Sequence, residues 1–392
     1  MATPTQTQTN VVPLNSELRR KGWLLEGLLQ AKAVSLFSGL RGTSSDAVIF
    51  VKTDLSKSAG HEVVFQFDGK VTGAAKRGKE RLRGNEEQKK LFSDKIRVER
   101  LRHGLDNGDD FDAIEVNNLA TAQHGNSRSL LANWYIEQRD QAVIDAGQGF
   151  LNNEALTHWI RPNNRATSGA ITSADVITYD FILDTEQAIK DGMGFTADSK
   201  SQTRSPLEPV ALANGQKQFI WFIDSMQAKQ LRQDTDLKSI LTGGDVRGAD
   251  NALIKGVLGS IGIFTFVELP TYMGSVVDRG MYGTEVEMVG MRRYNAATSK
   301  YSGEEGSTDA GIVTMRSFIA GKKAFQEAFG KMPDYKFKSS EDYDIDTGSA
   351  IELWAKTQKC ILAAENGDYN EAIVAGYNFG IVGVETYHST IA

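Results

Sequence analysis

Residues 68–94, DGKVTGAAKRGKERLRGNEEQKKLFSD, form a highly charged stretch with few large apolar residues. The stretch lies between HEVVFQF at 61–67 and KIRVERLR at 95–102, two runs whose alternating apolar and polar residues predict β-strands. A compact body of 392 residues has a radius of gyration of about 21 Å, whereas each half of such a hairpin can extend over about 43 Å. We therefore predict a hairpin arm that projects from the body and contacts a neighbouring molecule.

The rest of the sequence has the composition of an ordinary soluble globular protein. Hydrophobic residues make up 40% and charged residues 24%, the formal net charge is -6, and the length allows two or more domains. The single cysteine, Cys360, excludes an intrachain disulfide and fits a reducing cytoplasm, and we expect it to be a buried apolar residue. Residues 1–13 lack the pattern of a secretory signal, and no window has the roughly 20 apolar residues of a membrane span.

Helix and strand patterns alternate irregularly along the chain. Helices are predicted at 16–38, 126–149, 225–234, 312–329 and 350–356, and further strands at 46–51, 218–224, 262–269, 284–290, 372–377 and 379–387. The helix at 126–149 is the strongest, with Asn126 or Ser127 as its cap and Gly147 or Gly149 at its end. Because there is no regular βαβα alternation, we expect an α+β fold rather than a doubly wound sheet.

Two acidic runs resemble metal sites without completing one. Asp342, Asp344 and Asp346 have the spacing of a calcium loop, but Thr347 and Leu353 stand where that loop requires glycine and glutamate. The run DNGDDFD at 106–112 is better explained as a solvated acidic turn than as a cation site. We therefore predict no metal and no cofactor.

The common catalytic patterns are also incomplete. The five histidines are scattered, and the chain has no nucleophile elbow, no dinucleotide-binding turn and no P-loop. These absences favour a protein that is not an enzyme. They do not exclude a carboxylate-based hydrolase, because paired catalytic carboxylates leave no sequence pattern.

The first half of the arm is basic. Its cations are Lys70, Lys76, Arg77, Lys79, Arg81 and Arg83, against a single acidic residue, Glu80. Nucleic acid is one candidate partner, but the arm lacks interleaved aromatic residues and the whole chain is negatively charged. A solvated loop is a second explanation, and docking on an acidic surface of another subunit, with 106–112 as the acceptor, is a third.

The order of these elements resembles the major capsid proteins of tailed bacteriophages, which share the Johnson fold. The resemblance is closest to the branch whose hairpin ends in an LxGNEE run. Here that run is formed by Leu82, Gly84, Asn85, Glu86 and Glu87, and the turn VTG at 71–73 precedes it. The segments 54–65 (DLSKSAGHEVVF), 127–141 (SRSLLANWYIEQRDQ) and 219–234 (FIWFIDSMQAKQLRQD) are similar to the same branch.

The resemblance implies a division of the chain. The implied parts are an N-terminal arm with the first helix (1–58), an extended hairpin loop (59–105), a peripheral domain with the spine helix 126–149 (106–210), the first part of an axial domain (211–274), a return segment shared with the peripheral domain (275–345) and the closing strands of the axial domain (346–392). The hairpin would lie across an adjacent subunit. The candidate intersubunit contacts are Lys76, Arg77, Lys79, Arg81, Arg83, Glu86 and Glu87 on the arm, with Asp109, Asp110 and Asp112 as acceptors.

The function implied by the resemblance is structural. Such a chain would assemble into hexamers and pentamers of an icosahedral head that encloses double-stranded DNA, in the host bacterial cytoplasm, and remain in the virion capsid. The expected partners are other copies, a portal, a separate scaffolding protein, a cement or decoration protein, and DNA through weak contacts only, with no membrane. An encapsulin-like nanocompartment shell and, less well supported, a carboxylate-based hydrolase are the alternatives.

Overall fold

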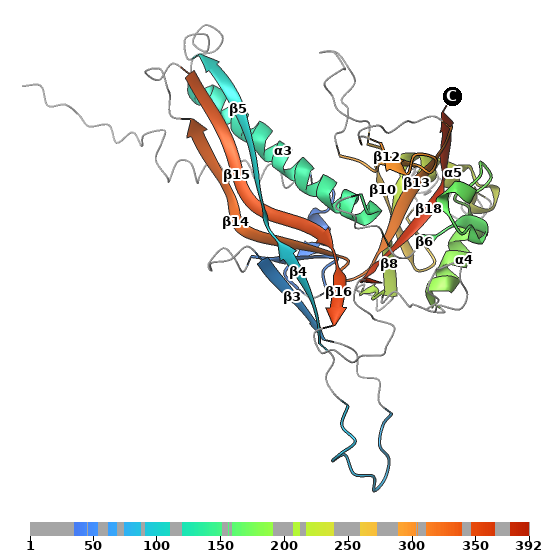
Figure 1. Ribbon diagram of the computed structural model, residues 1–392. Helices are drawn as coiled ribbons and strands as arrows, with labels where there is room; N and C mark the ends of the chain where they lie inside the picture. The colour runs from blue at the N-terminus through green and yellow to red at the C-terminus, as the bar shows by residue number, and fades with distance from the viewer. Residues whose placement is uncertain are drawn as a thin grey trace, which may run out of the picture.

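The fold is organised around one long helix, α3, Ala120–Gln148, in a computed structural model of the chain (Figure 1). The structure describes residues 35–44, 46–53, 62–68, 74–87, 91–109, 120–150, 156, 159–190, 207–211, 217–238, 259–272, 289–302, 304, 311–338, 346–364 and 377–391. The helix ends in a Schellman motif, in which Gly149 has a φ of +73° and the N–H of Phe150 donates to the carbonyl of Asp145 at 2.8 Å. Of the two glycines predicted to end this helix, Gly149 does so.

A five-stranded sheet lies along the N-terminal part of α3. Its strands, in spatial order, are β1 Arg41–Gly42, β2 Ile49–Lys52, β14 Phe325–Lys338, β15 Asp346–Lys359 and β5 Glu99–Asp109. Leu131 and Tyr135 of α3 pack on Ile351 and Leu353 of β15, and all four side chains are buried. One face of the sheet thus forms a core with the helix.

A nine-stranded sheet forms the second body. Its main path runs β12 Lys300–Tyr301, β11 Arg293–Asn295, β13 Gly311–Ala320, β8 Lys217–Asp224, β10 Phe264–Leu269 and β9 Ser260–Ile261, with β18 Ile381–Ile391, β6 Trp159–Ile160 and β7 Val210–Ala211 attached. Strands β8 and β10 are parallel and are joined through helix α5, Ser225–Gln233. Helix α4, Tyr179–Lys190, belongs to the same body, where Phe181 packs in a core around Trp221.

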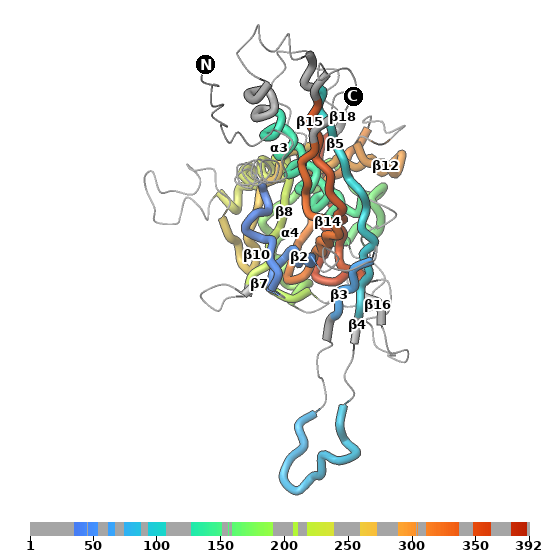
Figure 2. Tube along the Cα trace, turned by 90° about the vertical axis from the view of Figure 1, so that its left-hand side faces the viewer, coloured from blue at the N-terminus to red at the C-terminus, as the bar shows by residue number. Residues whose placement is uncertain are grey.

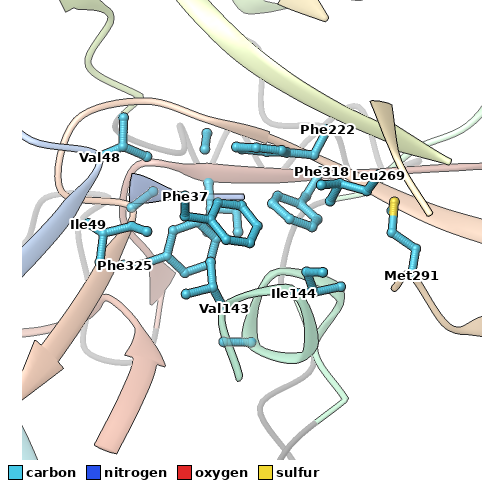
Figure 3. Close-up of a cluster of buried hydrophobic side chains, with 14 of the residues drawn as sticks. Phe37, Val48, Ile49, Val143, Ile144, Phe222, Leu269, Met291, Phe318 and Phe325 are labelled. Atoms are coloured by element: carbon cyan, nitrogen blue, oxygen red, sulfur yellow. The ribbon is translucent and has the colours of Figure 1, made fainter. Parts of the chain in front are cut away.

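The two bodies meet in a shared apolar core. Phe37, Val143 of α3, Phe222 of β8, Phe318 of β13 and Phe325 of β14 lie in one buried cluster (Figure 3). The chain passes from the nine-stranded sheet to the five-stranded sheet between β13 and β14, within this cluster. Because buried aromatic side chains from both sheets interdigitate there, the two sheets and α3 pack as one block.

The predicted hairpin is present, with a shifted second strand. Strand β3, Glu62–Asp68, pairs antiparallel with β4, Leu91–Arg97, so that Glu62 is opposite Arg97 and Asp68 is opposite Leu91. On its other edge β4 pairs with β16, Ile361–Ala364, which in turn pairs with β17, Tyr377–Asn378. The predicted strand at 95–102 therefore spans two strands, because after Val98 the chain enters β5 in a different sheet.

The α+β class is confirmed, as are the helix at 225–234 and the strands at 46–51, 218–224, 262–269 and 379–387, each within a few residues. The spine helix is confirmed but begins at Ala120, six residues before the predicted cap Asn126. Cys360 is buried as predicted. The predicted helix 16–38 lies almost wholly outside the described residues, as do most of the predicted strands 284–290 and 372–377 and the acidic positions 342 and 344.

Two predicted helices are wrong. Residues 312–320 lie in strand β13 and residues 325–329 in strand β14, with a short turn between them. Residues 350–356 lie in β15. Strand β13 is central in its sheet, paired on both sides, and its buried residues run almost without a break, so the alternation that identifies a strand is absent. Sheet pairing overrides the helix propensity of residues such as Ala, Lys, Glu and Met in this segment.

The sheets also cut across the expected domain boundary at 346. Strand β15, from 346–359, pairs with β14 and β5 in the five-stranded sheet, whereas β18 joins the nine-stranded sheet. Strand β13, expected in a return segment, is a central strand of the nine-stranded sheet. Along the chain, the nine-stranded sheet is therefore left between β13 and β14 and entered again between β16 and β18.

The contact between α3 and β13 generates a prediction. A Cβ at Gly147 would lie 2.6 Å from ring carbons of Phe318, which is fully buried and held between Phe222 and Phe325. Gly147→Ala should therefore destabilise the subunit by about 1–3 kcal/mol through overpacking, although alanine is the better helix former by about 1 kcal/mol. The measurement is the urea midpoint of the unassembled subunit.

The matched control is Gly39→Ala, because a Cβ at Gly39 has no atom within 4 Å. This variant should unfold within the error of the parent. A higher midpoint for Gly147→Ala than for the parent would contradict the close contact between α3 and β13.

Candidate intersubunit surface

The arm is anchored in the body at its base. Val63 and Phe65 of β3 and Ile96 of β4 are buried together with Ala328 and Cys360. The ammonium group of Lys52 on β2 donates to the carbonyl of Val64 at 3.0 Å and lies over the ring of Phe65. The hairpin base is therefore part of a packed core.

The tip of the arm, residues 74–87, stands clear of the body in both views (Figures 1 and 2) and every residue in it is exposed. Two turns shape it. Gly78 has a φ of +65° in the turn closed by Glu80 N–H and the Arg77 carbonyl, and Gly84 has a φ of +85° in the turn closed by Asn85 N–H and the Leu82 carbonyl at 2.8 Å. These left-handed conformations favour glycine.

The LxGNEE run supplies two further hydrogen bonds of the tip. The side-chain amide of Asn85 donates to the carbonyl of Arg81 at 3.0 Å, and a carboxylate oxygen of Glu86 accepts from the N–H of Gly84 at 2.7 Å. The run therefore shapes the tip through local hydrogen bonds. A tip of this kind is ordered before it meets a partner, which lowers the entropic cost of docking.

The cations of the tip have no anionic partner among the residues that the structure describes. Lys76, Arg77, Lys79, Arg81 and Arg83 are all exposed, and within the described part of the chain none of them forms an ion pair. The predicted arm contacts Glu86 and Glu87 lie on the same exposed tip. The structure thus gathers all seven arm candidates on one exposed surface.

The proposed acidic acceptor lies at the other end of the molecule. Residues 106–109 are not a turn, because they belong to β5 and pair with β15 from Asp106 opposite Gly348 to Asp109 opposite Asp346. Asp110 and Asp112 lie outside the described residues. Figure 1 places this end of β5 far from the tip of the arm, so residues 106–109 do not contact the tip of their own subunit.

Polar residues on one face of α3 hold the body together. Asp145 is buried and accepts from the guanidinium of Arg292 at 2.7 and 3.3 Å, while that guanidinium lies over the rings of Phe150 and Tyr272. Burial raises the pKa of Asp145 in spite of the opposing effect of Arg292. One turn further along α3, the buried Gln148 donates to the carbonyls of Arg292 and Arg316.

The same helix also fixes the segment that precedes β1. Asp140 accepts from the Ser35 hydroxyl at 2.9 Å, the Leu36 N–H at 2.8 Å and the Arg41 guanidinium at 2.8 Å. Arg41 and Arg139 both approach the buried Glu327 on β14. The sequence gave no indication of these partners, because they lie far from α3 along the chain.

The sheet surface carries one further charged cluster. Glu352 of β15 is buried among Arg100, Lys336 and Lys331, and the hydrogen bonds from Lys336 and Arg100 lower its pKa to about 2. Such a carboxylate stays ionised down to strongly acidic pH.

A shallow apolar groove lies between α3 and the five-stranded sheet. Its apolar walls are Leu101, Trp134, Tyr135, Ala142, Phe329, Leu353 and Ala355. The sequence gave no sign of it, because its walls come from four segments that only the fold brings together. The described residues contain no group of three or more candidate metal ligands, and no described helix is long and apolar enough to cross a membrane.

Comparison with known proteins relates this architecture to virus shells. Residues 4–150 match a family model described as a phage capsid protein. The chain is 23% identical to the major capsid protein of Pseudomonas phage KPP25 in an alignment of 284 residues, and the match covers 63% of this chain and 70% of that protein.

The structural similarity extends over nearly the whole chain. The head structure of Helicobacter pylori bacteriophage KHP40 matches with a TM-score of 0.65 and 15% identity, covering 91% of both chains. The capsid of Ralstonia phage GP4 matches with a TM-score of 0.60 and 18% identity, covering 91% of this chain and 92% of the other. The expected fold of the tailed-phage capsid subunits is confirmed.

The ion pair between Asp145 and Arg292 generates the prediction for this region. Asp145→Asn keeps the shape of the side chain but leaves the guanidinium of Arg292 buried without its counterion. Breaking a buried pair in this way costs about 3–5 kcal/mol, so the subunit should unfold at a clearly lower urea concentration.

Asp46→Asn is the matched control, because the pair of Asp46 with Lys322 lies at the surface, where the Asp46 side chain is 70% exposed. Its removal should change the midpoint little. Equal shifts for the two variants would show that α3 does not depend on its buried pair.

Proposed function

We propose that this chain is a major capsid protein of a tailed bacteriophage, and that many copies of it build the shell of the phage head. The observation that carries the proposal is the capsid-subunit fold, matched over 91% of the chain and of the head protein of KHP40. The family match over residues 4–150 and the similarity to a major capsid protein over 284 residues agree with it. The function is structural, and the protein belongs to the virion capsid.

The two bodies correspond to two roles in a shell. We assign the five-stranded sheet, α3 and the hairpin base to a peripheral domain, and the nine-stranded sheet with α4 and α5 to an axial domain that meets its symmetry mates at the centres of hexamers and pentamers. The shared core between the sheets supports this assignment, because a subunit that packs as one block transmits contacts at one end to the other.

The arm supplies the contact between neighbours. A surface on one subunit that binds a different surface on the next makes a heterologous contact, which closes into rings at five-fold and six-fold axes. The exposed tip and the position of the far end of β5, away from the arm, fit such a contact. We place the tip of each arm across the adjacent subunit, with its cations near carboxylates at the end of β5.

The remaining partners follow from the same role. A portal, a scaffolding protein and a cement or decoration protein would complete the head, which would assemble in the bacterial cytoplasm. The net charge of -6 limits the attraction of the shell for the packaged DNA, so DNA contacts would be weak. No cofactor is needed for a role of this kind.

Electron microscopy of the expressed chain tests the proposal. Negatively stained preparations should contain icosahedral shells, tubes or ordered sheets, with a scaffolding protein of the same phage added if closure needs one. Only small discrete particles at high protein concentration would contradict a capsid role. Small uniform shells from the chain alone, without scaffold or portal, would instead favour a nanocompartment of the same fold.

Charge reversal on the arm gives a second prediction. Changing Lys76, Arg77, Lys79 and Arg81 to glutamate should reduce shell assembly at low salt, because like charges would face each other across the contact. Light scattering during assembly at increasing salt measures the effect, and the variant should have lost the salt dependence of the parent.

The matched control reverses the partner side. Changing Asp109, Asp110 and Asp112 to lysine in the same chain should restore assembly of the arm variant. If reversal of the arm left assembly and its salt dependence unchanged, the charged contact would be excluded while the capsid role would stand.

A further inference from the structure

A hydrogen-bonded row of three side chains lies near the ends of β8 and β18 in the nine-stranded sheet. Asp224, the last residue of β8, is fully buried, and His388 of β18 is almost fully buried. A carboxylate oxygen of Asp224 lies 3.2 Å from Nε2 of His388, and Nδ1 of the same imidazole lies 2.8 Å from the Ser389 hydroxyl. The fold thus brings together a serine, a histidine and an aspartate, although Asp224 and His388 are 164 positions apart in the sequence.

A β-bulge explains how two consecutive residues of one strand can contact each other. In the pairing of β18 with β13, Tyr387 and Ser389 are opposite consecutive residues of β13, so that His388 is the extra residue. Consecutive side chains of a regular strand point to opposite faces, whereas a bulge changes the direction of the side chain. The side-chain amide of Gln230 donates to the carbonyls of Tyr387 and His388, so this part of β18 is also bound to α5.

The partners of Asp224 decide which nitrogen of the imidazole carries the proton. Its carboxylate also accepts from the N–H of Met226 at 2.8 Å and from the hydroxyl of Thr271, and an ionised carboxylate can only accept. Nε2 of His388 is therefore the donor to Asp224. In a neutral imidazole Nδ1 then has a free lone pair, which accepts from the Ser389 hydroxyl.

This arrangement is the one that activates a serine. A hydroxyl within about 2.6–3.2 Å of a base, with the base oriented by a third group, is the common geometry of serine nucleophiles on unrelated folds. Asp224 is also the N-cap of α5, but that role requires neither the imidazole nor the hydroxyl. Ser389 is only half-buried, so it remains open to solvent on one side.

We propose that Ser389 is an activated nucleophile that accepts acyl groups from activated esters. In this step a bond forms between Oγ of Ser389 and the carbonyl carbon of the ester, and the bond from that carbon to the alkoxy oxygen breaks. Nδ1 of His388 takes the hydroxyl proton and passes it to the leaving alcohol, so the step needs no oxidant and no cofactor. Asp224 is a positioning residue, because it orients the imidazole. This inference goes beyond the shell-forming function and does not depend on it.

A fluorophosphonate probe tests the proposal on the folded, full-length chain. Its phosphorus takes the place of the ester carbon, so that an Oγ–P bond forms, the P–F bond breaks and fluoride leaves. Peptide mass spectrometry should locate the probe on Ser389, with a labelling rate about 100-fold above that of Ser225. Ser225 is the internal control, since it is exposed, its hydroxyl is bonded to that of Thr271 at 3.0 Å, and it has no imidazole partner among the described residues.

Two variants separate activation of the serine from folding of the chain. His388→Gln should lower the labelling rate of Ser389 about 100-fold, because a general base accelerates such a step by about 10²–10⁴. Asp224→Asn keeps a good N-cap for α5 but removes the charge that orients the imidazole, and should lower the rate about tenfold or more. The urea midpoint of each variant shows that it is folded, and Asp224→Asn decides the question if His388→Gln does not fold.

Two results would overturn the proposal. One is labelling of Ser389 no faster than that of Ser225 in the folded parent. The other is equal labelling of the parent and a folded variant at His388 or Asp224. Neither result touches the capsid role, because the labelling does not require assembly.

Discussion

The buried carboxylates of α3 are the constraint on which the rest of the subunit depends. A carboxylate that is removed from water needs a cation or several hydrogen-bond donors, and Asp140 and Asp145 obtain theirs from segments far away in the sequence. Asp140 binds the chain before β1, and Asp145 binds Arg292, the residue directly before β11. A buried ion pair contributes little net stability, but a wrong alignment leaves a charge unpaired, so these pairs set the position of α3.

The apolar joint adds stability to that alignment. Phe318 of β13 and Phe325 of β14 belong to different sheets but to one cluster, so that neither sheet can move without disturbing the core of the other. The turn between β13 and β14 packs closely against Gly380, since a Cβ at Gly380 would lie 2.6 Å from the Lys322 carbonyl oxygen. A rigid body with a fixed arm base and a preformed tip suits assembly, because little conformational entropy remains to be lost when copies associate.

Sequence patterns predicted the elements whose signals are local. The hairpin and the glycine that ends α3 follow from turn and cap preferences within a few residues. The segment 312–329 was assigned to the wrong class because β13 is buried on both faces and its helix-forming residues show no alternation. The acidic run at 106–112 resembled a turn, yet its first residues continue β5, since pairing with β15 depends on residues more than 200 positions away.

Of the two surface features, only the arm could be predicted from the sequence. The charged arm is a continuous stretch of sequence, so its exposure and its need for a neighbour could be inferred from length and charge. The groove is built by residues from β5, α3, β14 and β15, and no window of sequence contains it. The groove forms only once β5 pairs with β15 and brings Leu101 opposite Leu353, so local patterns carry no information about it.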